Sequence, residues 1–218
     1  MSRPGISQRF MESSLVASIY ERQFRPALTW LGGGPSYAEE DRYLERWMDP
    51  VPGDILDLAC GTGRYTRRFA ARFPDRQAVG ADISAPMLAR AAQEPPRSRA
   101  DGRGLPPRYV TASAMALPFP SGAFGAASCF GALHLFPDPA AALVELGRVL
   151  APGGTLTVLT AAGADGGARL LFQQTFDRVA RLRFVPRGEV EAALATGGMT
   201  LEDWTPHGMM ALFCARRR

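Results

Sequence analysis

The sequence contains no lysine and no asparagine, so all 25 of its basic residues are arginines. The absence of lysine excludes a Schiff-base lysine and the phosphate-binding lysine of a P-loop, because both sites need an ammonium group. The absence of asparagine excludes an N-glycosylation acceptor. The loss of both residue types together is typical of the biased codon usage of a GC-rich genome.

Cysteines are few and long apolar runs are missing. The three cysteines, Cys60, Cys129 and Cys214, have no CxxC pairing and no metal-ligand spacing. We therefore expect reduced thiols and no metal site. No segment approaches the roughly 20 apolar residues of a membrane helix, and residues 1–8 do not resemble a signal peptide. These features predict a cytoplasmic protein without a membrane span.

The charge balance gives little reason to expect a nucleic-acid partner. The net charge is +4, and the excess of arginine lies mostly in residues 97–108 and 216–218. Neither segment interleaves the aromatic residues that a platform for stacked single-stranded bases needs. Solvated arginines are the favoured interpretation, and a functional basic patch is the alternative.

Short apolar runs alternate with amphipathic segments, which predicts an α/β fold with a mainly parallel sheet. A chain of 218 residues suits one domain. The Pro206–Gly208 connection predicts a final hairpin, so the last strand should run antiparallel to its neighbours. The strands are expected at 54–59, 77–82, 109–112, 126–130, 155–160, 199–205 and 209–215. The helices are expected at 7–30, 37–48, 64–73, 84–93, 139–150, 169–183 and 188–196.

The strongest motif is the segment Asp57–Gly63 (DLACGTG), which lies between a predicted strand and a predicted helix. Its glycines let the backbone turn sharply and approach a ligand, and the helix that follows offers free N–H groups to an anion. Asp82 ends the next strand, 19 residues after Gly63. A carboxylate at that place and distance binds both hydroxyls of a ribose.

A ribose-binding carboxylate is compatible with NAD or with another adenosine ligand. The NAD fingerprint G-x-G-x-x-G/A has Thr66 at its third glycine position, which weakens that interpretation. Asp57 weighs further against NAD, because its carboxylate would face a pyrophosphate of like charge. The same carboxylate would attract the ammonium of an amino acid. S-adenosylmethionine carries both a ribose and an ammonium.

Four segments in this order resemble the small-molecule class I methyltransferases of the type 11 group, which include the ubiquinone and menaquinone C-methyltransferases. They are Asp57–Gly63, Asp82, Ser113–Pro120 and Gly147–Leu156, and the resemblance covers about residues 53–160. It implies a Rossmann-like seven-stranded sheet with helices on both faces and a helical N-terminal cover. The single methyltransferase domain, 1–218, would comprise that cover (1–50), a cofactor-binding core (51–160) and substrate-side helices with a closing hairpin (161–218).

The resemblance also implies a function and a set of binding residues. The expected reaction transfers a methyl group from S-adenosylmethionine to oxygen or carbon of a small apolar or aromatic metabolite, leaving S-adenosylhomocysteine. The glycine loop and Asp57 would hold the methionine end, Asp82 the ribose, and Ile83 or Met87 the adenine ring. The full expected cofactor-binding set is Asp57, Ala59, Gly61, Thr62, Gly63, Asp82, Ile83, Met87, Ser113, Ala114, Met115 and Phe130.

The sequence departs from the family pattern at two places. Ser113 stands where the family usually has an aspartate that binds the adenine amino group, and Gly125 stands where the family has Phe-Asp at 124–125. A serine hydroxyl or the backbone of Ala114 and Met115 can still bond the adenine, but without the assistance of a charge. A protein that binds the cofactor without methylating, such as a cyclase, therefore stays an alternative.

Methyl transfer requires the enzyme to align the acceptor with the methyl group, and a hydroxyl or acidic-carbon acceptor also needs a base. His134 is the candidate base, because it follows the fourth predicted strand; the alternative is that it only packs or bonds the cofactor. Tyr20 is a candidate for bonding the cofactor carboxylate or the nucleophile, and Arg22 or Arg25 for pairing with that carboxylate. The aromatic residues that either line the substrate site or pack in the core are Tyr20, Phe24, Trp30, Phe172 and Phe176.

His207, in the final hairpin, is expected to be structural or exposed, and Cys60 to be a small buried residue. The arginine excess keeps an RNA (tRNA) methyltransferase as a second alternative, which would bind with a steep salt dependence. The expected partner is a small molecule rather than nucleic acid, and the oligomeric state is left open.

Overall fold

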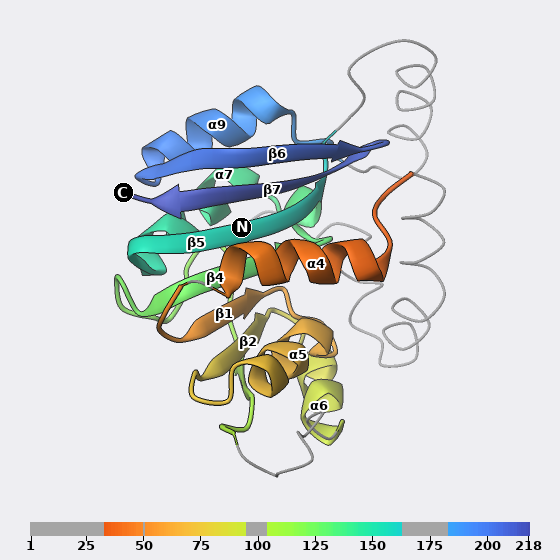
Figure 1. Cartoon of the computed structure of the whole chain (residues 1–218), viewed down its shortest axis with the longest axis vertical. Helices are drawn as coiled ribbons and strands as arrows, with labels where there is room; N and C mark the ends of the chain where they lie inside the picture. Colours follow the sequence, from red (N-terminus) through yellow and green to blue (C-terminus); the bar gives the residue numbers. More distant parts are fainter. Residues whose placement is uncertain (1–32, 50, 95–103, 163–182) are drawn as a thin grey trace.

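The computed structural model describes residues 33–49, 51–94, 104–162 and 183–218. They form a seven-stranded sheet in the order β3-β2-β1-β4-β5-β7-β6, drawn in Figure 1. β7 pairs antiparallel with both β5 and β6, and the other pairs are parallel. The expected sheet with its antiparallel last strand is confirmed. The strands are β1 (Ile55–Leu58), β2 (Ala78–Asp82), β3 (Arg108–Thr111), β4 (Phe124–Phe130), β5 (Leu150–Ala161), β6 (Met199–His207) and β7 (Met210–Arg217).

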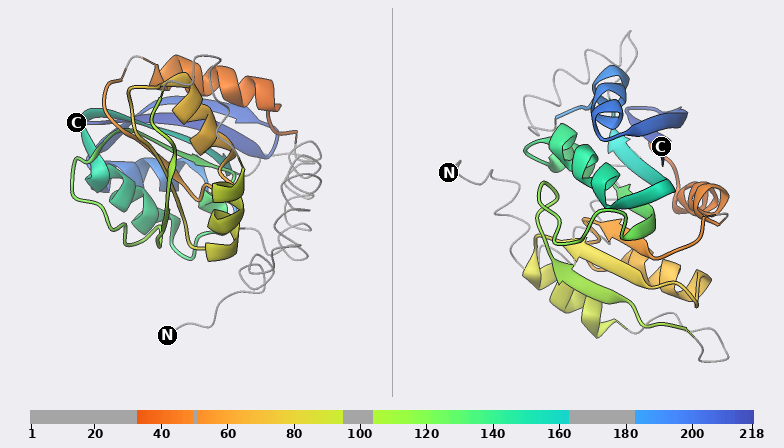
Figure 2. Two further views of the ribbon diagram at one scale, coloured as in Figure 1. Left: turned by 90° about the horizontal axis from the view of Figure 1, so that it is seen from below. Right: turned by 90° about the vertical axis from the view of Figure 1, so that its left-hand side faces the viewer.

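Helices cover both faces of the sheet, as Figure 2 shows. One face carries α4 (Tyr37–Met48), α5 (Arg64–Arg72) and α6 (Ala85–Gln93), and the other carries α7 (Pro139–Val149) and α9 (Arg187–Thr196). Successive strand residues point to opposite faces, so Ile55 packs with the α4 and α5 side chains while Leu56 and Leu58 pack with those of α7 and α9.

The caps of two helices follow from their sequences. Ser36 and Glu39 form a capping box at the start of α4. Ser84 caps α6, whose first turn contains a proline as expected. The expected helices at 37–48, 64–73, 84–93, 139–150 and 188–196 are present to within one residue at each end. The helices expected at 7–30 and 169–183 lie outside the described residues, apart from Arg183.

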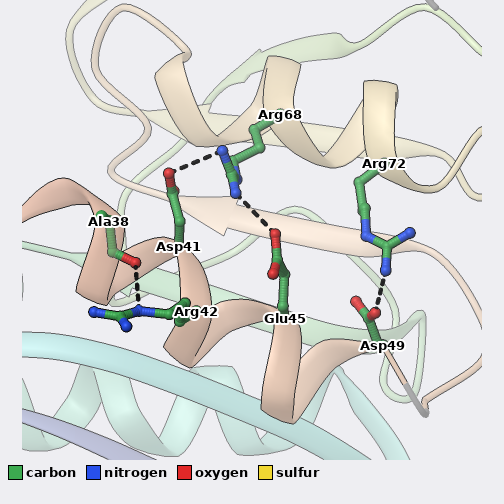
Figure 3. Close-up of polar contacts among 7 residues, drawn as sticks. All are labelled: Ala38, Asp41, Arg42, Glu45, Asp49, Arg68 and Arg72. Carbon is green, nitrogen blue, oxygen red and sulfur yellow. Dashed lines mark hydrogen bonds and ion pairs between the residues drawn. The ribbon is translucent and has the colours of Figure 1, made fainter.

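Helix α4 is positioned by polar contacts on two sides. Arg68 of α5 lies between Asp41 and Glu45, with nitrogen–oxygen distances of 2.9 Å to each, and Arg72 pairs with Asp49 (Figure 3). Tyr43 donates its hydroxyl to Asp203 of β6 at 2.8 Å. Exposed ion pairs contribute at most about 1 kcal/mol each. These contacts therefore fix the orientation of α4 more than they stabilise the molecule.

Several predicted strand boundaries are wrong: β4 begins at Phe124 rather than at 126, and β7 ends at Arg217 rather than at 215. In two further places, pairing between strands overrides the local turn signal. Strand β5 was expected to begin at Thr155, after Pro152–Gly154, but it begins at Leu150, which pairs with Phe124 before an irregularity in the register. The last hairpin turns at Gly208 and Met209 rather than over 206–208, because His207 pairs with Met210. Gly208 has φ +62°, a conformation that glycine adopts without steric cost.

Candidate functional site

The candidate site lies at the carboxyl edge of the parallel strands, where the chain leaves β1, β2, β3 and β4. The strand order reverses between β1 and β4, because β2 and β3 extend to one side of β1 while β4 and β5 extend to the other. In sheets of this kind ligands bind outside the carboxyl ends of the strands at this switch point. Most of the sequence-predicted residues of the core segment lie at these strand ends or shortly after them.

The glycine loop joins β1 to α5 through a series of left-handed residues. Ala59 has φ +55°, Gly61 +55° and Gly63 +76°. Gly63 donates its N–H to the carbonyl of Cys60, and α5 begins at the next residue. A Cβ atom on Gly63 would lie 2.5 Å from the hydroxyl oxygen of Tyr109. Glycine is therefore required at position 63 both by its backbone conformation and by the packing of Tyr109.

Asp82 closes the loop from the neighbouring strand. Its Oδ2 accepts the Gly61 N–H at 2.8 Å and its Oδ1 accepts the Ser84 N–H at 2.9 Å. Burial raises the pKa of this carboxyl above its usual value, against the lowering effect of the N–H donors from Ser84, Gly61 and Ile83. Asp82 is only half-buried, and a carboxylate has about four lone-pair sites, so one stays open beside the three N–H donors. The carboxylate can therefore accept a hydrogen bond from a ligand hydroxyl at this edge.

Asp57 occupies a different environment, inside the layer between the sheet and α5. Only 1% of its surface is exposed. Its carboxylate accepts hydroxyl hydrogen bonds from Thr66 of α5 at 2.6 Å and from Ser128 of β4 at 2.9 Å. Burial raises its pKa to about 6, and the two hydroxyls oppose the rise. This carboxylate braces the glycine loop against β4, and its contact with a ligand ammonium stays a prediction.

Thr66 and Ser128 were missed by the sequence reasoning. Thr66 was weighed only as a departure from the NAD fingerprint, whereas its side chain holds Asp57. Ser128 lies in the otherwise apolar strand β4 and is fully buried there. A hydroxyl within an apolar strand was the available signal, because a buried polar group needs a partner.

The residues predicted to contact adenine are placed unequally. Ile83, directly after Asp82, is 57% exposed, whereas Met87 is 2% exposed in the first turn of α6. Only Ile83 and Leu105 are large exposed hydrophobic residues in the described part of the chain. An exposed apolar side chain beside a carboxylate that can bind a ribose is better covered by the planar ring of a ligand than by water. Ile83 is thus the better placed of the two.

Ser113, Ala114 and Met115 form a tight turn directly after β3. The Ser113 hydroxyl accepts the Met115 N–H at 3.4 Å, and the Ser113 carbonyl accepts the Ala116 N–H at 3.1 Å. The turn is supported from α7, where Glu145 accepts the N–H of Leu117 at 2.9 Å. The serine at the position of the usual aspartate thus shapes the turn.

Phe130 is the last residue of β4, and His134 lies in the segment that directly follows this strand. Phe130 packs its ring against Tyr65 with centroids 5.1 Å apart. His134 lies in a short 3-10 helix, η2 (Leu133–Leu135), and its Nδ1 lies 3.2 Å from the N–H of Ala161. His207 lies at the far end of β6, in the hairpin. Cys60 is buried, as expected, and burial raises the pKa of its thiol well above the usual value.

Arg64, the first residue of α5, is a further side chain that the sequence reasoning missed. Its guanidinium lies 3.8 Å from the ring centroid of Tyr37 and 5.6 Å from that of Tyr65. The two tyrosine rings thus hold this cation at the first residue after the glycine loop. The candidates Tyr20, Arg22, Phe24, Arg25, Trp30, Phe172 and Phe176 all lie outside the described residues.

Comparison with known proteins gives the same family as the motifs. Residues 56–158 match the type 11 methyltransferase domain model. The demethylmenaquinone methyltransferase of Thermus thermophilus is 43% identical over 139 residues, which cover 63% of this chain and 61% of that relative. The matched segment thus spans less than two thirds of that protein.

Solved structures share the fold along most of the chain. An S-adenosylmethionine dependent methyltransferase from Mesorhizobium loti is 25% identical with a TM-score of 0.58, over 75% of this chain and 90% of that one. The [4+2]-cyclase SpnF is 23% identical with a TM-score of 0.66, over 94% and 96% of the two chains, a likeness that shows the fold alone. The segment 56–158, which carries the glycine loop and Asp82, belongs to the type 11 group of class I S-adenosylmethionine-dependent methyltransferase domains.

Proposed function

We propose that this protein transfers a methyl group from S-adenosylmethionine to a small apolar or aromatic metabolite, at carbon or oxygen. The observation that carries the proposal is the pairing of Asp82 with the glycine loop. A half-buried carboxylate, a left-handed glycine turn and an exposed isoleucine meet at one sheet edge. The carboxylate can accept hydrogen bonds from a ribose, the glycine turn lets the backbone approach the ligand closely, and the isoleucine offers an apolar surface to a planar base.

The residues fit this cofactor. Asp82 would bind the ribose, Ile83 would lie against the adenine ring, and the backbone at Gly61 and Gly63 would admit the methionine end. The remaining members of the cofactor set, Ala59, Thr62, Met87, Ala114, Met115 and Phe130, stay predictions, as do Asp57 and Ser113. When bound, S-adenosylmethionine supplies an electrophilic methyl group. The protein's own task is then to orient the acceptor and exclude water.

The acceptor class is inferred from the similar proteins rather than from a pocket. The Thermus thermophilus relative is named for demethylmenaquinone, and we infer a ring of quinone type for this chain as well. The three cysteines lie buried and unpaired, which suits the reducing cytoplasm that we propose for the protein. No described helix is long and apolar enough to cross a membrane.

The RNA alternative has lost part of its support. Arg216 bonds Glu202 at 2.9 Å, and Arg217 bonds the carbonyls of Gly197 and Gly198. Arg218 bonds the Thr200 hydroxyl at 2.8 Å. These three arginines fasten β7 to β6 and to the end of α9, so the basic tail has a structural use.

The first experiment is calorimetric titration of the full chain with S-adenosylhomocysteine, with NADH as the competing dinucleotide. We expect S-adenosylhomocysteine to bind and Asp82→Asn to weaken it by about 10- to 100-fold, since a hydrogen bond to a charged group is worth about 1.5–3 kcal/mol. Asp75→Asn, which changes an exposed carboxylate away from this edge, should bind like the parent.

Three outcomes count against parts of the proposal. Binding of NADH in place of S-adenosylhomocysteine, or no binding by a folded protein, would remove the cofactor assignment. An Asp82→Asn protein with undiminished affinity would remove the role of Asp82 alone. Binding without methyl transfer to reduced short-chain demethylmenaquinone, or to any screened acceptor, would favour the cofactor-binding cyclase alternative.

A further inference from the structure

His134 makes an unusual contact with the end of the neighbouring strand. After Phe130 the chain leaves β4 at Gly131, which has φ +75° and donates its N–H to Leu159 of β5. Ala161, the last residue of β5, donates its backbone N–H to Nδ1 of His134 at 3.2 Å. The hydroxyl oxygen of Thr160 lies 3.4 Å from the same ring nitrogen.

This contact determines which ring nitrogen carries the proton. A backbone N–H can only donate, so the nitrogen that it contacts must offer a lone pair. Nδ1 is therefore unprotonated, and the single proton of the neutral imidazole lies on Nε2. The hydroxyl of Thr160 can also donate to Nδ1, so both neighbours favour the same tautomer.

We propose that His134 is held as the Nε2–H tautomer and serves the site as a positioning residue, not as the base expected from the sequence. To take up a proton, the ring would have to accept it at Nδ1 and break its bond with the Ala161 N–H. The inference rests on the methyl-transfer function proposed above. It implies that the acceptor loses its proton to another group or to water, and that the rate depends on alignment.

The positioning role follows from the two segments that the bond connects. His134 and Ala161 are 27 residues apart in the chain, and they lie where β4 and β5 end at the candidate site. Val185 donates its N–H to the carbonyl of Ala161 at 2.9 Å, so the same residue also anchors the chain that leads to α9. The imidazole thereby ties η2 to the end of β5.

The tautomer is measured directly by nitrogen NMR of the full chain labelled with ¹⁵N-histidine. The protein contains only two histidines, and His207→Gln assigns their signals. We expect His134 to carry its proton on Nε2 and a lone pair on Nδ1, and we expect Thr160→Val to leave this unchanged. A proton on Nδ1, an averaged mixture of tautomers, or release of the tautomer in Thr160→Val would overturn the proposal.

The positioning role is tested by amide hydrogen exchange at Ala161. His134→Asn places a carbonyl oxygen near the position of Nδ1, whereas His134→Leu offers no acceptor. We expect exchange at Ala161 to be about five- to tenfold faster in the leucine variant than in the parent, and close to the parent in the asparagine variant. Equal exchange in all three proteins would refute the positioning role. Neither measurement needs bound cofactor, so failure of the proposed function would appear separately, in the titration with S-adenosylhomocysteine.

Discussion

Ala59 has a strained backbone conformation in the loop that follows β1. It is the only non-glycine residue with positive φ in the described part of the chain. A side chain in the left-handed region costs about 1–2 kcal/mol, because Cβ crowds the following carbonyl. The loop therefore retains a strained residue immediately before Cys60 and Gly61.

We predict that Ala59→Gly stabilises the protein by about 0.5–1 kcal/mol, the relief of strain being partly offset by the greater entropy of the unfolded glycine. Chemical denaturation of parent and variant measures the difference. Gly61→Ala, which introduces the same strain where it is now absent, serves as the opposite control and should destabilise. A loss of stability in Ala59→Gly would mean that its methyl packing outweighs the backbone term.

The two carboxylates of the motif also differ at this scale, although both follow apolar strand residues. Asp82 lies half-exposed at the end of β2, with backbone N–H donors. Asp57 is buried between the sheet and α5, where it accepts hydrogen bonds from hydroxyls of α5 and β4. The first is available to a ligand, whereas the second already has two partners.

At the scale of elements, the start of β4 explains a departure that seemed functional in the sequence. Gly125 lies at the amino end of β4, opposite the edge that carries the candidate site. Its N–H bonds the carbonyl of Asp54, and a Cβ atom there would overlap the carbonyl oxygen of Pro52. Glycine at this position lets the segment before β1 cross β4, which is a structural reason for the departure from the family pattern.

We predict that Gly125→Ala destabilises the protein by about 3 kcal/mol or more, because the clash is with backbone atoms that cannot rotate away. Gly188 in α9 is the matched control, since a Cβ atom there meets nothing within 4 Å. Gly188→Ala should be neutral or stabilising by up to about 1 kcal/mol. Thermal unfolding of both variants tests the contrast, and equal effects would contradict the proposed crossing.

At the scale of the whole molecule, the buried carboxylate of Asp57 makes folding depend on pH. Its pKa is about 6 in the folded protein and 3.8 in the reference state. The folded state therefore binds this proton more tightly than the unfolded state does. The contribution to stability is complete below about pH 4 and is lost as the pH rises through 6.

Asp57→Asn should remove this dependence. The free energy of unfolding of the variant minus that of the parent should rise by up to about 3 kcal/mol between pH 4 and pH 7. Urea denaturation across this range measures the difference at each pH. Asp75→Asn removes an exposed carboxylate and is the control. The same trend in that variant would show that net charge, not burial, causes the effect.

Features that depend on residues close together in the sequence were predictable, whereas contacts between distant residues were not. The glycine loop, the caps of α6 and the strand alternation depend on residues within a few positions of each other, and they were predictable. The partners of Asp57 were not, because Ser128 is 71 residues away. The pairing of Leu150 with Phe124 is of the same kind, since a strand boundary depends on its neighbour.

The sequence by itself determined the order of strands and helices, the turn at Gly61 and Gly63, and the acid at the end of β2. These depend on backbone preferences and on the period of apolar residues, which are local properties. The tertiary structure decided that Asp57 is buried while Asp82 reaches the edge, that Ile83 rather than Met87 stays exposed, and that Ala161 faces Nδ1 of His134. Burial and hydrogen-bond partners arise only when distant segments pack together, and they set the chemistry of each side chain.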